Sequence, residues 1–468
     1  MTRTTFSLLS LLAAVSITGD AAAQRAPAHP LRAAEKALGT DGSIDWGFHR
    51  VVEDPHGLGL KFPGYLIGVE KSDRDIIGVV DTGAAARVRI DRAPAGSNVE
   101  QRRLLRRVLN DGKRTFVSHV VEYEWRGEPV PHLRPAFLHN AYARTAAAAR
   151  HMNWEHAGAR GEYPFFNPGS TLYDDSFEAL DKLGRSLQQR LEAARAAGAP
   201  VSHVFVASMG WNTDEDEALR NYNSIFGNLF EAERAHPGRV LTAPVVIGFS
   251  WPSRWAVGGI SYPTKADDAD EVGVVWGNYL LQRVLLPLKE RYGFRVVVLG
   301  HSFGARLTTR AVFSAPVLGV TKPREKVDLV VGLQGAFSAN RFLAERAVGQ
   351  EGAPYAGYRA AARQVVLTWS PYDKANPLAE YGWSANNVGG RPGYERSREY
   401  PAHFQWKRWS PGEGWLPGAE ERDGKILMVD ASDLVRYRTY QKGGGAHSDI
   451  YHPAMGRFLL DLVRAYAP

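Results

Sequence analysis

Cysteine is absent from all 468 residues of the chain. The protein therefore has no disulfide bond, no thiolate metal ligand and no thiol nucleophile. A chain of this length with 44% hydrophobic residues has enough apolar material for a large core, so it does not need disulfides for stability. The composition predicts a globular protein with more than one domain.

Long runs of basic residues are also missing. The 57 Lys and Arg residues exceed the 50 Asp and Glu residues by a formal charge of +7, but they are spread along the chain. This distribution does not predict a nucleic-acid partner. The chain has no His-Glu-x-x-His segment, no paired acidic calcium loop and no Gly-x-Gly-x-x-Gly after a strand, so neither a metal nor an organic cofactor is predicted.

An apolar segment, Phe6–Ile17, follows Arg3 near the N-terminus, and Ala21–Ala23 offers a small-x-small cleavage site. We interpret residues 1–23 as a secretory signal, which predicts a secreted or periplasmic protein with no integral membrane segment after signal removal. The alternative is a membrane anchor, although the segment is shorter than the ~20 residues that a spanning helix needs. No cysteine stands near the cleavage site to carry a lipid.

The rest of the chain divides by composition. Residues 24–42 are rich in Ala, Arg and Pro and are predicted to form a linker. Residues 43–150 are predicted to form a small β-rich N-terminal module without recognisable chemistry. Its strand-like segments are Gly64–Val69, Asp75–Val80, Ala86–Ile90 and Thr115–Val121.

From residue 170 to residue 468 the pattern alternates between strands and helices, which predicts an α/β domain with a mostly parallel sheet flanked by helices. The predicted helices are Ser176–Ala197, a second that begins near Asp214, and Asp267–Arg291. The predicted strands are Val201–Val206, Val245–Phe249, Arg295–Leu299, Asp328–Gly332, Gln364–Thr368 and Lys425–Val429.

Residues 374–423, called here the aromatic insertion, separate the last two predicted strands. The segment is predicted to be irregular and contains Trp383, Trp406, Trp409 and Trp415. Loops of this length inside a domain are usually functional or disordered, and so many aromatic residues argue against disorder. The insertion is either a cap over a substrate pocket or a structural cover on the sheet edge.

The segment Gly300–Gly304 reads Gly-His-Ser-Phe-Gly and lies between a Val-rich strand and a helical segment. In a sharp strand-to-helix turn the central serine is held exposed at the end of the sheet, and Gly300 and Gly304 avoid collisions with neighbouring elements. Ser302 is therefore predicted to be a nucleophile. His301, directly before it, is predicted to pack beneath the turn and not to act as the base.

A serine hydroxyl needs a base, and the base needs an acid that orients it. Asp373 follows the predicted strand Gln364–Thr368, and His447 follows the last predicted strand in a Gly-rich loop. This Ser, Asp, His order matches the order found in α/β-hydrolases. Asp430 remains an alternative acid, and His452 remains an alternative base.

Acyl transfer also requires donors for the developing oxyanion. The backbone amide of Phe303, at the predicted helix start, is one candidate. The other is the amide of Trp211 in the loop Ser208–Thr213, where Gly210 permits close approach.

Five ordered segments resemble a little-characterised group of bacterial serine hydrolases with the α/β-hydrolase fold. These segments are Met209–Asn212, Phe249–Ser253, Gly300–Gly304, Ser370–Lys374 and Gly445–Ser448. The group has His at the position of Met209, a difference that leaves the backbone donor of the loop in place. The resemblance implies the fold and the Ser302, Asp373, His447 triad, and it says little about the substrate.

These observations predict a serine hydrolase that cleaves a carboxylic ester, either a small molecule or a polymer, through an acyl-enzyme. An amide or peptide hydrolase would use the same triad. A third possibility is a secreted binding protein that retains a hydrolase fold, although a disused site has no reason to keep all three residues.

Overall fold

A computed structural model of the protein describes ten ranges of residues and one single position. The ranges are 58–71, 115–124, 134–141, 172–253, 262–320, 323–343, 353–376, 386–412, 424–437 and 445–468, and the single position is 415. The predicted signal (1–23) and linker (24–42) lie outside the described residues, as do the predicted strands Asp75–Val80 and Ala86–Ile90.

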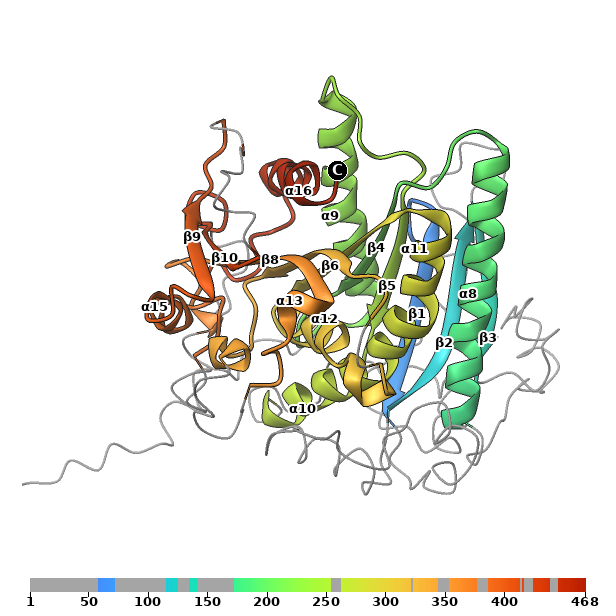
Figure 1. Cartoon of the computed structure of the whole chain (residues 1–468), viewed down its shortest axis with the longest axis horizontal. Helices are drawn as coiled ribbons and strands as arrows, with labels where there is room; N and C mark the ends of the chain where they lie inside the picture. The colour runs from blue at the N-terminus through green and yellow to red at the C-terminus, as the bar shows by residue number, and fades with distance from the viewer. Residues whose placement is uncertain are drawn as a thin grey trace, which may run out of the picture.

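The described strands form one ten-stranded sheet in the order β3-β2-β1-β5-β4-β6-β7-β8-β10-β9 (Figure 1). Among them only β2 runs against the direction of the others. The strands are β1 (Gly64–Lys71), β2 (Thr115–Glu124), β3 (Arg134–Asn140), β4 (His203–Ser208), β5 (Val245–Ser250), β6 (Arg295–His301), β7 (Val327–Leu333), β8 (Ala362–Trp369), β9 (Phe404–Arg408) and β10 (Ile426–Asp430).

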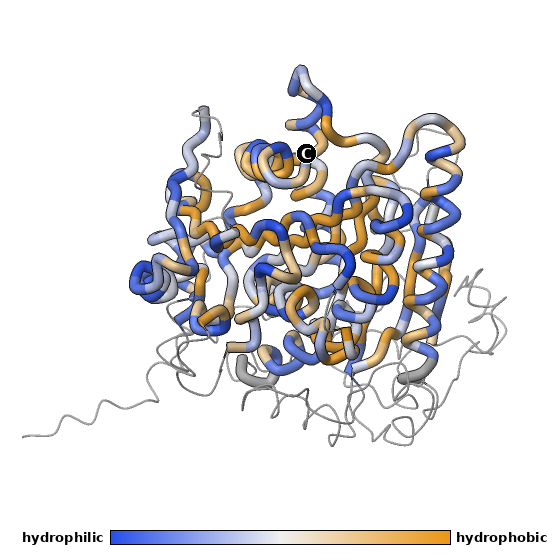
Figure 2. Tube along the Cα trace, viewed as in Figure 1, coloured by the Kyte–Doolittle hydropathy of each residue, from blue (hydrophilic) through white to orange (hydrophobic). Residues whose placement is uncertain are grey.

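Helices cover both faces of the sheet, so the central strands are buried along their whole length and mostly apolar. β4, β5 and β7 are buried at every residue. Figure 2 shows this as hydrophobic colour along the central strands and hydrophilic colour on the outer helices. The apolar runs that predicted these strands therefore form the centre of the hydrophobic core.

Two hydrophobic clusters lie on opposite faces. α8, the α10–α11 segment and α12 contribute to one, and α9 and α16 contribute to the other. The helices are α8 (Leu172–Ala196), α9 (Glu215–Ala235), α10 (Tyr262–Val272), α11 (Leu286–Tyr292), α12 (Phe303–Phe313), α13 (Tyr358–Ala361), α15 (Arg391–Arg398) and α16 (Pro453–Tyr466). Between α10 and α11 the chain continues through π-helical turns at Gly273–Gly277 and Leu280–Leu285.

The region predicted as an N-terminal module, residues 43–150, contains β1, β2 and β3. These strands extend the main sheet. β1 pairs in parallel with β5, and β2 and β3 follow at the edge. Two polar contacts tie them to the helices: His119 Nε2 lies 2.9 Å from Glu215 Oε2, and the Lys71 ammonium lies 2.6 Å from Asp268 Oδ1. The local β pattern predicts strands, but it does not tell whether they join an existing sheet.

The aromatic insertion is more regular than its sequence indicates. It contains α15 and the edge strand β9, which pairs in parallel with β10. The prediction of an irregular stretch is wrong at β9, because a short half-exposed strand with Gln, Lys and Arg has no apolar run. Trp409 and Trp415 are buried against Phe458 of α16, with ring centroids 5.5 and 6.3 Å apart. Trp383 lies outside the described residues.

The mostly parallel sheet flanked by helices confirms the predicted fold class. Each strand predicted between residues 201 and 429 is present, with ends shifted by a few residues. Within the ranges given above, no helix has the length and apolar character needed to cross a membrane.

Candidate active site

Ser302 occupies a strained turn between β6 and α12. Its φ of 56° and ψ of −121° are unusual for a residue with a side chain. A Cβ added at Gly304 would lie 2.0 Å from the carbonyl oxygen of Ser208, and one at Gly300 would lie 2.4 Å from the Cα of Ala305. Both positions require glycine, so the motif has the close strand-to-helix packing of a nucleophile elbow.

The loop after β4 lies against this turn. A Cβ added at Gly210 would be 2.7 Å from Ser302 Cβ and 3.2 Å from its hydroxyl oxygen. Trp211 follows, with its ring centroid 6.4 Å from that of Phe303, the first residue of α12. Asp214 then caps the N-terminus of α9. The structure thus brings Trp211 and Phe303, the two residues predicted as oxyanion donors, close together beside the Ser302 turn.

The end of β5 fixes the loop in this place. The Trp251 indole N–H donates to the Met209 carbonyl at 2.9 Å, and the Ser253 carbonyl accepts from the Asn212 amide at 3.1 Å. The Ser253 hydroxyl donates to the Thr213 carbonyl and accepts from the Thr213 amide. The Phe-Ser-Trp-Pro-Ser segment therefore supports the loop through Trp251 and Ser253. Met209 is buried, and only its backbone carbonyl enters this support.

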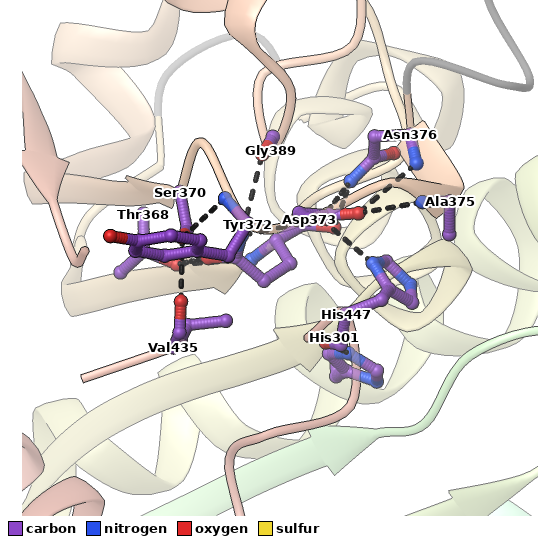
Figure 3. A network of polar contacts seen from close by, with 11 residues as sticks. His301, Thr368, Ser370, Tyr372, Asp373, Ala375, Asn376, Gly389, Val435 and His447 are labelled. Atoms are coloured by element: carbon purple, nitrogen blue, oxygen red, sulfur yellow. Dashed lines mark hydrogen bonds and ion pairs between the residues drawn. The ribbon is translucent and has the colours of Figure 1, made fainter. Parts of the chain in front are cut away.

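Asp373 and His447 are in direct contact. His447 Nδ1 donates to Asp373 Oδ2 at 2.8 Å (Figure 3). Their loops are joined by an isolated β-bridge between Asp373 and Gly445, and the Ala446 amide donates to the Tyr372 carbonyl at 3.0 Å. Gly445 has a φ of 61°, and a Cβ there would lie 2.5 Å from the Tyr372 carbonyl oxygen. This glycine lets the histidine loop approach the acid closely.

Four further donors converge on the Asp373 carboxylate. The amides of Ala375 and Asn376 donate to Oδ1 at 3.0 and 3.2 Å. The side-chain amides of Asn376 and Gln334 donate to Oδ2 at 2.9 and 3.2 Å. Burial by itself raises the pKa of Asp373, but the charge of His447 and the hydrogen bonds from His447 and Asn376 outweigh it. The pKa is therefore held below its ordinary value of 3.8.

His301 lies beneath the turn. It is 4% exposed, its Nε2 donates to the His447 carbonyl at 3.0 Å, and the two imidazole centroids are 4.8 Å apart. Burial, together with the neighbouring charge of His447, lowers the pKa of His301 to about 3. His301 is therefore a neutral hydrogen-bond donor to the histidine loop, not a base.

Asp430 and His452, the alternative acid and base, have other contacts. Asp430 accepts from the Ser432 amide at 3.0 Å. His452 makes its hydrogen bond to the Leu434 carbonyl at 3.0 Å and stands at the N-terminus of α16. Among the described residues, no hydrogen bond joins Asp430 or His452 to Ser302 or His447, so the described hydrogen bonds favour Asp373 and His447.

The hydroxyl of Ser302 and the imidazole of His447 are not joined by a hydrogen bond among the described contacts, although His301 links the two residues. Catalytic hydrogen bonds are often long before substrate binds. Within the described ranges, no group of three or more His, Cys, Asp or Glu side chains could hold a metal ion. The arrangement can supply a nucleophile, an oriented base and backbone donors.

Sequence reasoning missed Gln334 and Asn376, which donate to the Asp373 carboxylate, and Thr368, which hydrogen-bonds Gln334. Gln334 directly follows β7, the strand beside the nucleophile strand β6. A polar residue at the carboxyl end of an otherwise apolar strand was the available signal. Its pairing with Asp373 depends on loops distant in sequence, so the pattern alone could not reveal it.

The parallel strand order and the elbow at Ser302 define an α/β-hydrolase fold. No protein-family profile and no curated protein matches the chain. Among solved structures, the chain is similar to the lin2722 gene product of Listeria innocua, with 12% identity over 55% of this chain and 92% of that one and a TM-score of 0.29. The catalytic core domain of acetyl xylan esterase from Trichoderma reesei has 14% identity over 50% and 84% of the two chains, with a TM-score of 0.21. A cutinase-like protein from Cryptococcus sp. has 10% identity over 56% and 94%, with a TM-score of 0.24. These similarities are distant, and the fold assignment rests on the topology and the elbow.

Proposed function

We propose that the protein is a serine hydrolase that cleaves a carboxylic ester. The observation that carries the proposal is the partly buried Asp373–His447 hydrogen bond beside the strained Ser302 turn. Asp373 accepts a hydrogen bond from the Nδ1–H of His447, which leaves His447 Nε2 unprotonated and able to accept a proton. This is the tautomer that a general base needs.

In the proposed reaction, the Ser302 hydroxyl attacks the ester carbonyl while His447 Nε2 takes its proton. The backbone amides of Phe303 and Trp211 stabilise the oxyanion of the tetrahedral intermediate. The intermediate expels the alcohol, which takes the proton from His447, and Ser302 is left acylated. Water, deprotonated by His447, then attacks the acyl-enzyme. The second tetrahedral intermediate expels the Ser302 oxygen, which takes the proton back from His447, and the carboxylic acid is released.

Hydrolysis of p-nitrophenyl acetate, butyrate and octanoate, with labelling by a fluorophosphonate, tests this function. Ser302→Ala is expected to abolish labelling and to lower turnover by ~10³-fold or more. Asp373→Asn is expected to lower kcat by up to ~10⁴-fold, because the wrong histidine tautomer is favoured, whereas Asp430→Asn should retain activity. Equal rates for wild type and Ser302→Ala would reject the proposal.

We also propose that the protein is exported, on the basis of the N-terminal apolar segment. N-terminal sequencing of the protein recovered from the host's periplasm or medium tests this. A mature N-terminus just after residue 23 is expected, and an intact N-terminus in the cell interior would contradict it.

A further inference from the structure

Gln334 has an unusual backbone for a buried side chain. It is 0% exposed, directly follows β7, and has a φ of 47°. Non-glycine residues adopt this region at an energetic cost, and such strain is often found at functional sites. Its position at the carboxyl end of the sheet places it near Asp373.

Both polar atoms of the Gln334 side chain have hydrogen-bond partners. Its Oε1 accepts from the Thr368 hydroxyl at 2.7 Å. Its Nε2 donates to Asp373 Oδ2 at 3.2 Å and to the Gly389 carbonyl at 3.3 Å. Asp373 and Gly389 fix which end of the amide faces Asp373, because an ionised carboxylate and a backbone carbonyl can only accept hydrogen bonds. The amide nitrogen therefore faces the carboxylate.

The backbone of Gln334 joins the same network. Its N–H donates to Thr368 Oγ1 at 3.0 Å, and its carbonyl accepts from Asn376 Nδ2 at 2.9 Å. That same Asn376 amide group also donates to Asp373 Oδ2 at 2.9 Å. Gln334 thus holds Asp373 directly through its side chain and indirectly through Asn376.

Gln334 and His447 donate to the same oxygen of Asp373. A donor on that oxygen stabilises the ionised carboxylate and fixes its plane, which sets the direction of the His447 ring. We propose that Gln334 is a positioning residue for the hydrolytic reaction, acting through Asp373 on His447. This inference rests on the proposed function.

Gln334→Leu tests the role, with Gln364→Leu as the matched control. Gln364 is also a buried glutamine, 4% exposed, but its Nε2 donates only to the carbonyls of Val365 and Lys425. We expect Gln334→Leu to lower kcat per fluorophosphonate-labelled site by about 10–100-fold with little change in KM. Gln364→Leu should leave kcat per labelled site near that of wild type. Equal kcat values in both variants would overturn the inference.

Gln334→Glu gives a second readout that a structural role would not produce. A carboxyl beside Asp373 would share one proton with it, and burial and like charge would raise the pKa of that proton. While the proton is bound, the new side chain can donate to Asp373. We therefore expect kcat to acquire a falling limb as pH rises, which Gln334→Leu should lack. A pH profile of wild-type shape would contradict the proposal.

If wild type is not labelled at Ser302, the proposed function fails whatever Gln334 does. If wild type is labelled and turns over ester, but Gln334→Leu matches Gln364→Leu, only the role of Gln334 is rejected.

Discussion

The Nε2 of His301 donates a hydrogen bond to the backbone carbonyl of His447 at 3.0 Å. The residue directly before the proposed nucleophile therefore holds the loop of the proposed base. Because the ring of His301 is buried and its pKa is about 3, it stays neutral when His447 takes up a proton. The link joins two segments 146 positions apart and adds no positive charge beside them.

His301→Leu is expected to lower kcat by about tenfold or more, because the His447 loop loses its hydrogen bond to the elbow. His203→Leu is the matched control: His203 is another buried histidine, bonded to the Ala467 carbonyl at 2.7 Å. Steady-state ester hydrolysis per fluorophosphonate-labelled site measures the effect. Equal kcat values for the two variants would show that the His301 bond does not serve the reaction.

The same histidine predicts a pH dependence of stability. In the unfolded chain His301 binds a proton below about pH 6.5, but in the folded protein only near pH 3. Its contribution to stability is therefore complete above pH 6.5 and is lost as pH falls from 6.5 toward 3. In this window His301→Leu should reduce the slope of unfolding free energy against pH by up to about 1.4 kcal/mol per pH unit. Urea unfolding at several pH values measures this, and identical slopes would contradict it.

The nucleophile turn was predictable from sequence because its residue pattern is contiguous and lies between a strand and a helix. Gly300 is forced by contact with Ala305 of α12, whereas Gly304 is forced by contact with Ser208 at the end of β4. The pairing of Asp373 with His447 was also accessible, because parallel strands bring their carboxyl ends to one edge. Chain order alone left Asp430 as an alternative, because it also lies between Ser302 and His447. The hydrogen bond from His447 to Asp373 distinguishes the two.

Other features depend on contacts that no local pattern contains. β9 is short and polar, and it is a strand because β10 offers a free edge to pair with. Gln334 holds the acid only because segments around Thr368, Asn376 and Gly389 meet there. The same holds for β1, whose apolar alternation predicts a strand but not its parallel pairing with β5.

Gly210→Ala is expected to reduce kcat/KM by at least about tenfold, because the added methyl group would push the loop away from Ser302. Gly227→Ala in α9 is the control, since an added Cβ there meets nothing within 4 Å. That variant should keep its activity and gain about 0.5–1 kcal/mol of stability, because alanine favours a helix over glycine. Ester hydrolysis and urea unfolding of both variants check the pair. Full activity in Gly210→Ala would show that the loop does not need to touch the turn.

Trp409 distinguishes the two interpretations of the aromatic insertion. It is 3% exposed, packs on Phe458 and donates from its indole N–H to Asp461 Oδ2 at 3.0 Å. These contacts join the insertion to α16 and support a structural cover at this position. Trp409→Ala should lower the free energy of unfolding by about 3–5 kcal/mol, because it leaves a large cavity.

The milder Trp409→Phe keeps most of the ring and removes the hydrogen bond, so it should lose about 1 kcal/mol and remain folded. If Trp409 only stabilises the sheet edge, this variant will show the same relative rates on acetate, butyrate and octanoate esters as wild type. A changed acyl-chain preference would instead indicate that the residue shapes a substrate pocket. Because the readout is a ratio of rates, a partial loss of folded protein cannot imitate it.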